Sequence, residues 1–322
     1  MGGFVKRVGD HRPEERMKLM KNTGLGFIGL GQMGAGMARN LGASTGPFFI
    51  YDASPNALAA FADTDAIVAD TAAAMADNCD LLFLCLPSAR EVNAVIFDAG
   101  GLAESARPGL TIVDTSTIDR AEAIRIHHAL AERGIAYADC PISGLPFRAN
   151  DGSLTLMFGG DPDLFTAVRP HLEKMGAFIV HCGDVGSGQL MKAVNNIIYD
   201  INIVALCEIL PLAVAGGLSV DALHRVTTSG SSRSFAGDHF VPRMLARQFD
   251  NDFAMEDAYK DILNVQKIAV ENRAMTPLMN AMTSSYQTAI ASGLGREPKS
   301  AIIKIYERVL GTTFSHGDPK DD

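Results

Sequence analysis

The sequence predicts an N-terminal α/β domain with a doubly wound parallel sheet, followed by an all-α domain, with one long helix joining the two. Short apolar runs alternate with helical segments from Leu25 onward, and a glycine-rich turn follows the first of these runs. After Gly188 the sequence reads as helix throughout. Alternation of this kind is typical of a parallel sheet, because each parallel connection needs a crossover helix. We expect the first domain at residues 24–185 and the second at residues 186–314.

The strands of the first domain are predicted from short apolar runs, as expected for strands that are covered on both faces. Strands are expected at Leu25–Ile28, Phe48–Tyr51, Leu81–Leu86, Thr111–Asp114, Ala136–Asp139, Leu154–Phe158 and Phe178–His181. Helices are expected between them, for example at Arg120–Arg133 and Pro162–Met175.

The long helix is predicted from Gln189 to Ala215 and is apolar on nearly every side. A helix without a polar face is expected to be buried all round, either in a core or between domains or subunits. Pro211 is expected to kink or shorten it near residues 207–211. The run 197–217 comes closest to a membrane span, but Asp200, Asn202, Glu208 and Pro211 interrupt it, so no span is predicted.

Composition limits the classes of partner. The chain has 322 residues, of which 47% are hydrophobic and 20% charged, and this balance is globular. Its net charge of −9 argues against a nucleic acid or an anionic membrane as partner. The histidines and cysteines show no metal-ligand spacing, so no metal is predicted. Residues 1–23 lack a secretory apolar stretch and are expected to be a flexible extension, residues 315–322 a disordered tail, and the protein cytoplasmic.

A phosphate-binding loop is predicted directly after the first strand, where the sequence reads GFIGLGQMG. In this GxGxxG pattern Gly29 allows a tight turn, Gly31 lets the backbone approach a pyrophosphate, and Gly34 lets helix and strand pack closely. The following helix supplies free amides and a positive dipole end. The pattern predicts a Rossmann-type dinucleotide site that comprises Gly29, Leu30, Gly31, Gln32, Met33 and Gly34.

Asp52 ends the second strand, about 20 residues after the loop, which is the spacing of a ribose-binding carboxylate. A carboxylate there would accept hydrogen bonds from ribose hydroxyls and repel a 2′-phosphate. Ala53, Ser54 and Pro55 follow where NADP-preferring domains place a cation. NAD is therefore favoured over NADP, while the alternative interpretation is a structural aspartate at the end of the strand.

Lys192 and Asn196 are four residues apart and hence on one face of the long helix, one turn from each other. They follow the glycine-rich segment GDVGSG at residues 183–188. Desolvation would lower the pKa of a buried lysine, which suits proton exchange with a substrate hydroxyl. A lysine that extends to solvent beside an asparagine partner explains the spacing equally well.

Several further motifs make the sequence resemble the β-hydroxyacid dehydrogenases, the family of 3-hydroxyisobutyrate dehydrogenase and tartronate semialdehyde reductase. The resemblance covers residues 25–310. Its motifs are FIGLGQMGAGMARNL (27–41), DTSTID (114–119), DCPISG (139–144), GSLTLMFGGD (152–161), GDVGSGQLMKAVNN (183–196) and FAMEDAYKD (253–261).

The resemblance implies hydride transfer between NAD(H) and a short β-hydroxy acid or its semialdehyde. Lys192 would be the catalytic acid/base, and Asn196 would hold the substrate hydroxyl or carbonyl. Lys260 would close over the nicotinamide and the substrate. The resemblance also implies a homodimer or homotetramer that associates through the helical domain.

The resemblance also assigns binding residues near the ends of the strands. Ser143 and Gly144 would bind the substrate carboxylate, while Leu86, Pro87 and Thr117 would line the cofactor. Leu145 departs from the pattern, because it stands where the family usually has a second glycine, and this puts the shape of the substrate pocket in doubt.

Other interpretations remain open. Arg233 either binds a second carboxylate of the substrate or is a solvated loop arginine. Asn195 stands where a 6-phosphogluconate dehydrogenase would have histidine, and the chain is short for that enzyme. An imine reductase would share the architecture but generally lack the lysine. A non-catalytic NAD-binding sensor or scaffold is the alternative from another functional class.

Overall fold

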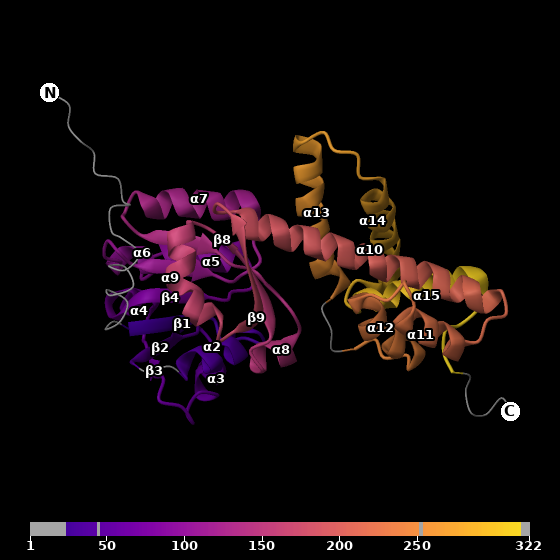
Figure 1. The fold of residues 1–322 in the computed structure, drawn as a ribbon, viewed down its shortest axis with the longest axis horizontal. Helices are drawn as coiled ribbons and strands as arrows, with labels where there is room; N and C mark the ends of the chain where they lie inside the picture. Colours follow the sequence, from indigo (N-terminus) through magenta and orange to yellow (C-terminus); the bar gives the residue numbers. More distant parts are fainter. Residues whose placement is uncertain (1–23, 44–45, 251–253, 317–322) are drawn as a thin grey trace. The chain divides into compact units, whose positions relative to one another are not determined.

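The computed structural model describes residues 24–43, 46–250 and 254–316. The chain divides into two compact units, Met1–Lys192 and Ala193–Asp322, which are described separately. Figure 1 follows the elements in chain order. The predicted extension 1–23 and the last six residues of the predicted tail, 317–322, lie outside the described residues.

The first unit is a sheet covered by helices. Its strands are β1 (Gly24–Ile28), β2 (Phe48–Tyr51), β3 (Ile67–Val68), β4 (Cys79–Leu84), β5 (Thr111–Asp114), β6 (Ala136–Asp139), β7 (Ile142–Ser143), β8 (Leu154–Gly159) and β9 (Gly176–Gly183). Its helices are α2 (Gly34–Gly42), α3 (Pro55–Ala59), α4 (Ala72–Asn78), α5 (Ala89–Phe97), α6 (Leu102–Ser105), α7 (Arg120–Ala131), α8 (Pro146–Asn150) and α9 (Pro162–Leu172).

The sheet has the order β3-β2-β1-β4-β5-β6, all parallel, which is the doubly wound dinucleotide-binding order. The predicted α/β fold class is confirmed. At one edge β8 pairs antiparallel with β6 and β7, and β9 pairs parallel with β8. We did not predict β3 and β7, because two residues are too few for a periodic pattern.

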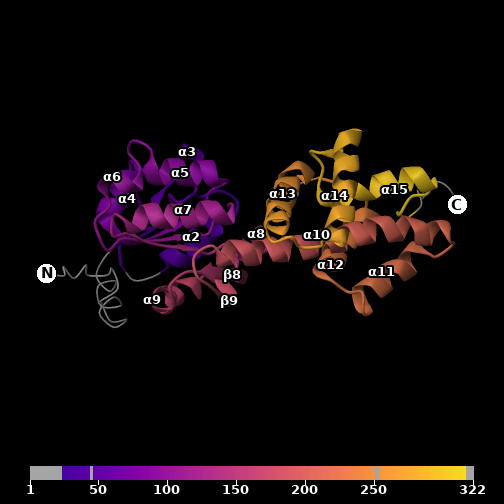
Figure 2. The same ribbon diagram turned by 90° about the horizontal axis from the view of Figure 1, so that it is seen from above.

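Strand side chains alternate between the two faces of the sheet and build two separate cores. Phe27 and Phe83 face a core with α2, α8 and α9, whereas Ile28 and Leu82 face a core with α4, α5, α6 and α7. Figure 2 shows α5 and α7 on one side of the sheet and α9 on the other. Both faces are thus covered, and ligands can reach the sheet only at the ends of its strands.

The second unit is helical. Helix α10 (Ser187–Ala215) begins in the first unit and continues into the second. The further helices are α11 (Val220–Ser229), α12 (Phe235–Leu245), α13 (Met255–Glu271), α14 (Pro277–Ala289) and α15 (Ile303–Leu310), with a π-helical turn at Ile290–Leu294 and a 3-10 turn at Lys299–Ile302. The only β-pairing in its described residues is an isolated bridge between Ala254 and Pro298.

Helix α10 bears on two expectations. It continues through Pro211 to Ala215, so the proline does not shorten it, and the kink at Pro211 stays a prediction. Its second half contributes Cys207 and Leu210 to the core of the helical unit, but Ile209 and Leu212 are each about half exposed. Within a single chain α10 is thus not buried on all sides, and its predicted burial between subunits stays a prediction.

By length and composition alone, α10 is the one helix in the described part of the chain that could cross a membrane. Such a helix is weak support for a membrane span, because the core helix of a folded protein passes the same test. Asp200 lies in the middle of α10 and pairs with Lys299, which is a feature of a protein core rather than of a lipid-facing surface.

A buried ion pair joins α10 to the 3-10 turn of the helical unit. Lys299 Nζ lies 2.6 Å from Asp200 Oδ1, and the two side chains are only 8% and 1% exposed. The Lys299 ammonium also lies 5.0 Å from the centre of the Tyr199 ring. Removing one partner of such a pair leaves the other charge buried without compensation.

We expect Lys299→Met to lower the free energy of unfolding by about 3–5 kcal/mol, because the Asp200 carboxylate loses its counter-ion. Lys304→Met is the matched control, since Lys304 pairs with Glu297 at a more exposed site, and it should cost about 1 kcal/mol or less. Urea denaturation of both variants at one protein concentration measures the difference. Equal effects of the two substitutions would contradict the prediction.

Candidate active site

The glycine-rich loop lies between β1 and α2, next to β4, where the strand order reverses. Gly29 has a φ of +96°, and a side chain there would meet the Cys85 carbonyl. A Cβ on Gly34 would lie 1.9 Å from the Gly29 carbonyl oxygen. A Cβ on Gly31 would meet nothing within 4 Å. Two glycines thus permit close packing, and the third leaves open space above the loop.

This loop fits the pyrophosphate of a dinucleotide. Helix α2 begins at Gly34, and its N-cap residue Met33 makes no side-chain capping hydrogen bond to the first amides. Helix N-termini with such amides bind phosphate. The open side of Gly31 provides room for a ligand to approach the backbone closely. The predicted roles of the three glycines are thus consistent with the space around each of them.

Asp52 lies just beyond β2 and is tied to the loop. Its Oδ2 accepts a hydrogen bond of 2.6 Å from the Leu30 amide, and its Oδ1 accepts one of 2.7 Å from the Ser54 amide. The carboxylate is half-buried. It therefore helps to shape the loop, and each oxygen keeps a lone pair for a further donor.

The segments after β4 and β5 lie side by side at the same edge. The Leu86 amide donates to Ser116 Oγ at 2.9 Å, and Pro87 and Thr117 directly follow these two residues. Ser88 caps α5, where its Oγ accepts from the Arg90 amide at 3.1 Å.

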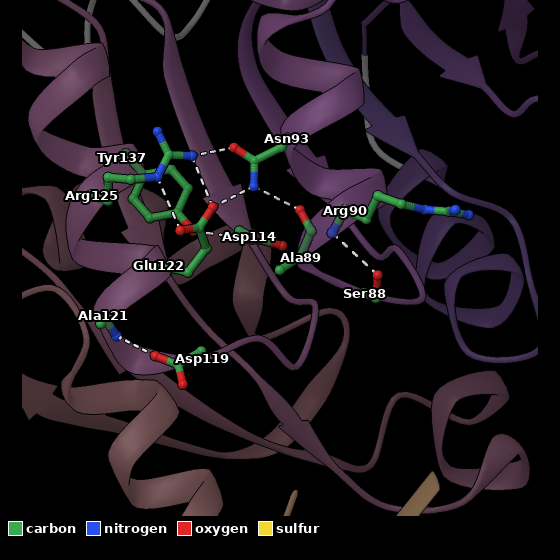
Figure 3. Close-up of polar contacts among 10 residues, drawn as sticks. All are labelled: Ser88, Ala89, Arg90, Asn93, Asp114, Asp119, Ala121, Glu122, Arg125 and Tyr137. Atoms are coloured by element: carbon green, nitrogen blue, oxygen red, sulfur yellow. Dashed lines mark hydrogen bonds and ion pairs between the residues drawn. The ribbon is translucent and has the colours of Figure 1, made fainter. Parts of the chain in front are cut away.

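The other helix at this edge, α7, is capped by Asp119, whose Oδ1 accepts a 2.7 Å bond from the Ala121 amide. Figure 3 shows both capped helix starts.

A polar cluster joins α5 to α7 behind these caps (Figure 3). Arg125 donates to Glu122 at 2.8 and 2.9 Å and also contacts the Asn93 side chain. Asn93 in turn donates to Glu122 and, at 2.7 Å, to the Ala89 carbonyl. The hydrogen bond from Arg125 holds the pKa of Glu122 below its usual value. The cluster thus fixes the two helix starts against each other.

Two buried carboxylates lie at the ends of β5 and β6. Asp114 accepts from the Ser116 amide at 2.9 Å and from the Tyr137 hydroxyl at 3.0 Å. Burial raises the pKa of Asp114 and that of Asp139 to about 6 each. Neither residue was predicted as part of the site, although each is an acid at the end of an apolar run, a signal that could have identified them.

Asp139 anchors the start of α10. Its Oδ1 accepts a 2.6 Å bond from the Gly186 amide, and its Oδ2 accepts a 2.7 Å bond from the Gln189 amide. A Cβ on Gly188 would meet the Met157 carbonyl at 2.3 Å, so the helix start lies directly against the sheet. Lys192 follows less than one turn after Gln189 and is half-buried. The first unit thus holds Lys192 on a helix that is fixed to the end of β6.

Ser143 and Gly144 lie a few residues beyond the end of β6. Ser143 belongs to β7 and pairs with Thr155. Gly144 has a φ of +145°, and a side chain there would lie 2.7 Å from Leu154 Cδ2 and 3.3 Å from Arg148 Cβ. Leu145 follows as the residue before α8 and is half-buried.

The remaining predicted residues belong to the helical unit, where each has a carboxylate partner. Asn196 Nδ2 donates to Asp261 Oδ2 at 3.1 Å. Lys260 pairs with Asp257 at 3.1 Å and Arg233 with Asp238 at 3.0 Å, with side chains 75% and 63% exposed. No cluster of possible metal ligands occurs among the residues that the structure describes.

Comparison with protein families identifies both parts of the chain. Residues 24–183 match the NAD-binding domain of 6-phosphogluconate dehydrogenase. Residues 186–306 match the NAD-binding domain of NADP-dependent 3-hydroxyisobutyrate dehydrogenase. The chain therefore carries NAD(P)-binding domains along most of its described length.

Characterised relatives cover nearly the whole chain. A 2-(hydroxymethyl)glutarate dehydrogenase of Eubacterium barkeri is 32% identical over 92% of this chain and 99% of its own length. An NAD-dependent L-serine dehydrogenase of Pseudomonas aeruginosa is 30% identical over 89% and 99%. The crystal structure of a 3-hydroxyisobutyrate dehydrogenase from Salmonella typhimurium is similar with a TM-score of 0.79, at 28% identity over 88% of this chain and 100% of that one. The chain belongs to the β-hydroxyacid dehydrogenase family and is an NAD(P)-dependent oxidoreductase.

Proposed function

We propose that this protein catalyses the reversible, NAD-dependent oxidation of a short β-hydroxy acid to its semialdehyde, with Lys192 as the acid/base. The position of Lys192 carries this proposal. It lies on the first turns of α10, which Asp139 anchors at the end of β6, on the same edge of the parallel sheet as the glycine-rich loop after β1. Asn196 follows one turn later on the same helix.

The cofactor is proposed to lie along the edge formed by the loops after β1, β2, β4 and β5. The amides of residues 29–34 would hold the pyrophosphate, Asp52 the ribose, and Leu86, Pro87 and Thr117 the remainder. When bound, the nicotinamide supplies the hydride chemistry, taking a hydride from the alcohol carbon or returning it. The protein supplies position and charge.

The proton is proposed to move at Lys192. In oxidation, neutral Nζ takes the hydroxyl proton as the carbonyl forms, and in reduction the ammonium returns it. The amide of Asn196 would hold the same oxygen without adding charge. The Ser143 hydroxyl and the Gly144 amide would bind the carboxylate, which places the hydroxyl carbon at a fixed distance from them.

The relatives suggest the class of substrate. The three substrates in their names share a hydroxymethyl group on a carbon that bears a carboxylate, and they differ in the other substituent of that carbon. We propose the same unit for this protein, with 3-hydroxyisobutyrate or the glycerate/tartronate semialdehyde pair as candidates. Leu145 would face the variable substituent. Lys260 and Arg233 remain proposed substrate ligands, and each would exchange its present carboxylate partner for the substrate.

Self-association through the helical unit is part of the proposal. Exposed aliphatic side chains of this unit favour it, since Ile209 and Leu212 on α10 and Val226 on α11 are all more than half exposed. A homodimer or homotetramer would cover them. The non-catalytic sensor and the imine-reductase-like enzyme are the alternatives, and turnover with hydroxy acids distinguishes both from the proposal.

Initial rates of NADH formation test the function, with 3-hydroxyisobutyrate, glycerate, 3-hydroxypropionate, L-serine and 2-(hydroxymethyl)glutarate as substrates. We expect Lys192→Ala to lower kcat by about 10²–10⁴ and to retain NAD binding, because only the proton transfer is lost. The control is Lys174→Ala, which removes an exposed lysine of the same unit. Full activity of Lys192→Ala would refute the acid/base role, and tight NAD binding without turnover of any substrate would favour the sensor.

The open space above Gly31 leads to a separate prediction. We expect Gly31→Ala to fold with unchanged thermal stability but to bind NAD at least about tenfold more weakly, because the added methyl group occupies the space proposed for the pyrophosphate. Gly34→Ala should instead lower the melting temperature, since its Cβ would collide with the Gly29 carbonyl. Calorimetric titration with NAD and thermal melts measure both. Unchanged NAD affinity of Gly31→Ala would place the pyrophosphate elsewhere.

Asp52 is proposed to set the preference for NAD. We expect Asp52→Asn to raise the NADP-to-NAD ratio of kcat/KM by about tenfold, or about 1.4 kcal/mol, because the substitution removes a negative charge that faces the 2′-phosphate. The amide oxygen can still accept one loop hydrogen bond, which limits damage to the loop. A wild-type enzyme that prefers NADP would contradict the proposed role of Asp52.

A further inference from the structure

Gln189 is a buried amide on the first turn of α10. Its side-chain Oε1 accepts a hydrogen bond of 3.1 Å from the Ile118 amide, and its Nε2 donates one of 2.8 Å to the Ser116 carbonyl. The residue is only 3% exposed. The two bonds bracket Thr117, so a single side chain fixes the backbone on both sides of a proposed cofactor-lining residue.

The hydrogen bonds continue from Gln189 in two directions. Ser116, which it holds, accepts the Leu86 amide at 2.9 Å and donates its own amide to Asp114 at 2.9 Å. The Gln189 backbone amide donates to Asp139 at 2.7 Å. Gln189 therefore contacts the segment after β5 directly, reaches the segment after β4 through Ser116, and begins the turn that leads to Lys192.

We propose that Gln189 is a positioning residue that sets Lys192 and the cofactor-lining segments around Leu86 and Thr117 in one fixed geometry. This inference rests on the proposed function, because it takes Lys192 as the acid/base and the two segments as cofactor contacts. The hydride leaves the alcohol carbon and the proton leaves the oxygen bonded to that carbon. The positions of the nicotinamide and of Lys192 Nζ relative to each other must therefore be set precisely. Through the Gln189 side chain, two hydrogen bonds connect the backbone on either side of Thr117 to the helix that carries Lys192.

A purely structural role for Gln189 makes a different prediction. An amide that only satisfies buried backbone groups would, when lost, lower stability and leave the kinetics of the folded enzyme unchanged. A positioning role predicts lower kcat and weaker NAD binding at temperatures where the variant is fully folded. The two roles are therefore separated by kinetics rather than by stability.

The test is a double-mutant cycle with Gln189→Leu and Lys192→Ala, measured on the substrate that the wild-type enzyme turns over. We expect Gln189→Leu to lower kcat by roughly 10²-fold and to weaken NAD binding several-fold. In the Lys192→Ala background its effect on kcat should be clearly smaller, because the displaced acid/base is then missing and only the cofactor-lining segments are disturbed. Equal effects in both backgrounds, or an unchanged kcat, would overturn the proposal.

Two further variants keep the result interpretable. Gln266→Leu is the matched control, because Gln266 also connects two elements through an amide hydrogen bond, to Thr283 at 3.1 Å. It should lower stability without changing kcat. Gln189→Glu replaces Gln189→Leu in the test if the leucine variant does not fold.

An ionised carboxylate cannot donate a hydrogen bond to the Ser116 carbonyl, whereas a protonated carboxyl can. The activity of Gln189→Glu relative to the wild-type enzyme should therefore rise as pH falls. An activity ratio that does not depend on pH would count against the role.

The experiments distinguish failure of the proposed acid/base role of Lys192 from failure of the proposed positioning role of Gln189. If Lys192→Ala were fully active, the acid/base assignment would fail, and calorimetric NAD affinity would still report on Gln189 and its hold on Thr117. If Lys192→Ala were inactive while Gln189→Leu matched the wild type in both kcat and NAD affinity, the proposed function would stand and the role of Gln189 would fail.

Discussion

The anchoring of α10 by the Asp139 carboxylate is the interaction on which the arrangement of the site depends. Each oxygen of this buried group accepts one backbone amide from the start of the helix, at Gly186 and at Gln189. Hydrogen bonds to an ionised carboxylate are stronger than those between neutral groups. This contact therefore sets the position of the residues at the start of α10, including Lys192. Burial raises the pKa of this carboxyl, while the hydrogen bonds from the backbone amides act in the opposite direction.

Several hydrogen bonds hold the loops at this same edge of the sheet. The loop after β1 is held by Asp52, the segment after β4 by Ser116, and the segment after β5 by Gln189. Each of these hydrogen bonds connects parts of the chain that are distant in sequence. A dinucleotide that lies across such an edge would meet backbone groups that are already in place, so little ordering would be needed on binding. Rigidity at this edge suits a hydride transfer, where distance controls the rate.

Most of the fold could be predicted from the sequence, whereas the roles of the site residues stay predictions. Three strands have the predicted bounds, namely Phe48–Tyr51, Thr111–Asp114 and Ala136–Asp139. Strands that are covered on both faces are short, nearly continuous apolar runs, and such runs can be recognised in the sequence. The antiparallel pairing of β8 could not be predicted, since it depends on a two-residue strand and on long-range register. The network of Asp114, Asp139 and Gln189 was missed for a related reason. Burial of a polar side chain is visible only once its distant backbone partners are placed.

The contrast between Gly31 and Gly34 also bears on how this loop can diverge. A methyl group at position 34 would collide with the Gly29 carbonyl in the backbone of the loop itself. A substitution there would therefore impair folding, whether or not a ligand binds. At position 31 a Cβ would meet no protein atom within 4 Å, so a methyl group there would conflict only with a ligand bound at the loop. We therefore expect selection for folding to maintain Gly34 and selection for ligand binding to maintain Gly31. In a lineage that no longer bound the cofactor, Gly31 could be substituted while Gly34 was retained. A substitution at position 31 beside a retained Gly34 would then indicate loss of cofactor binding.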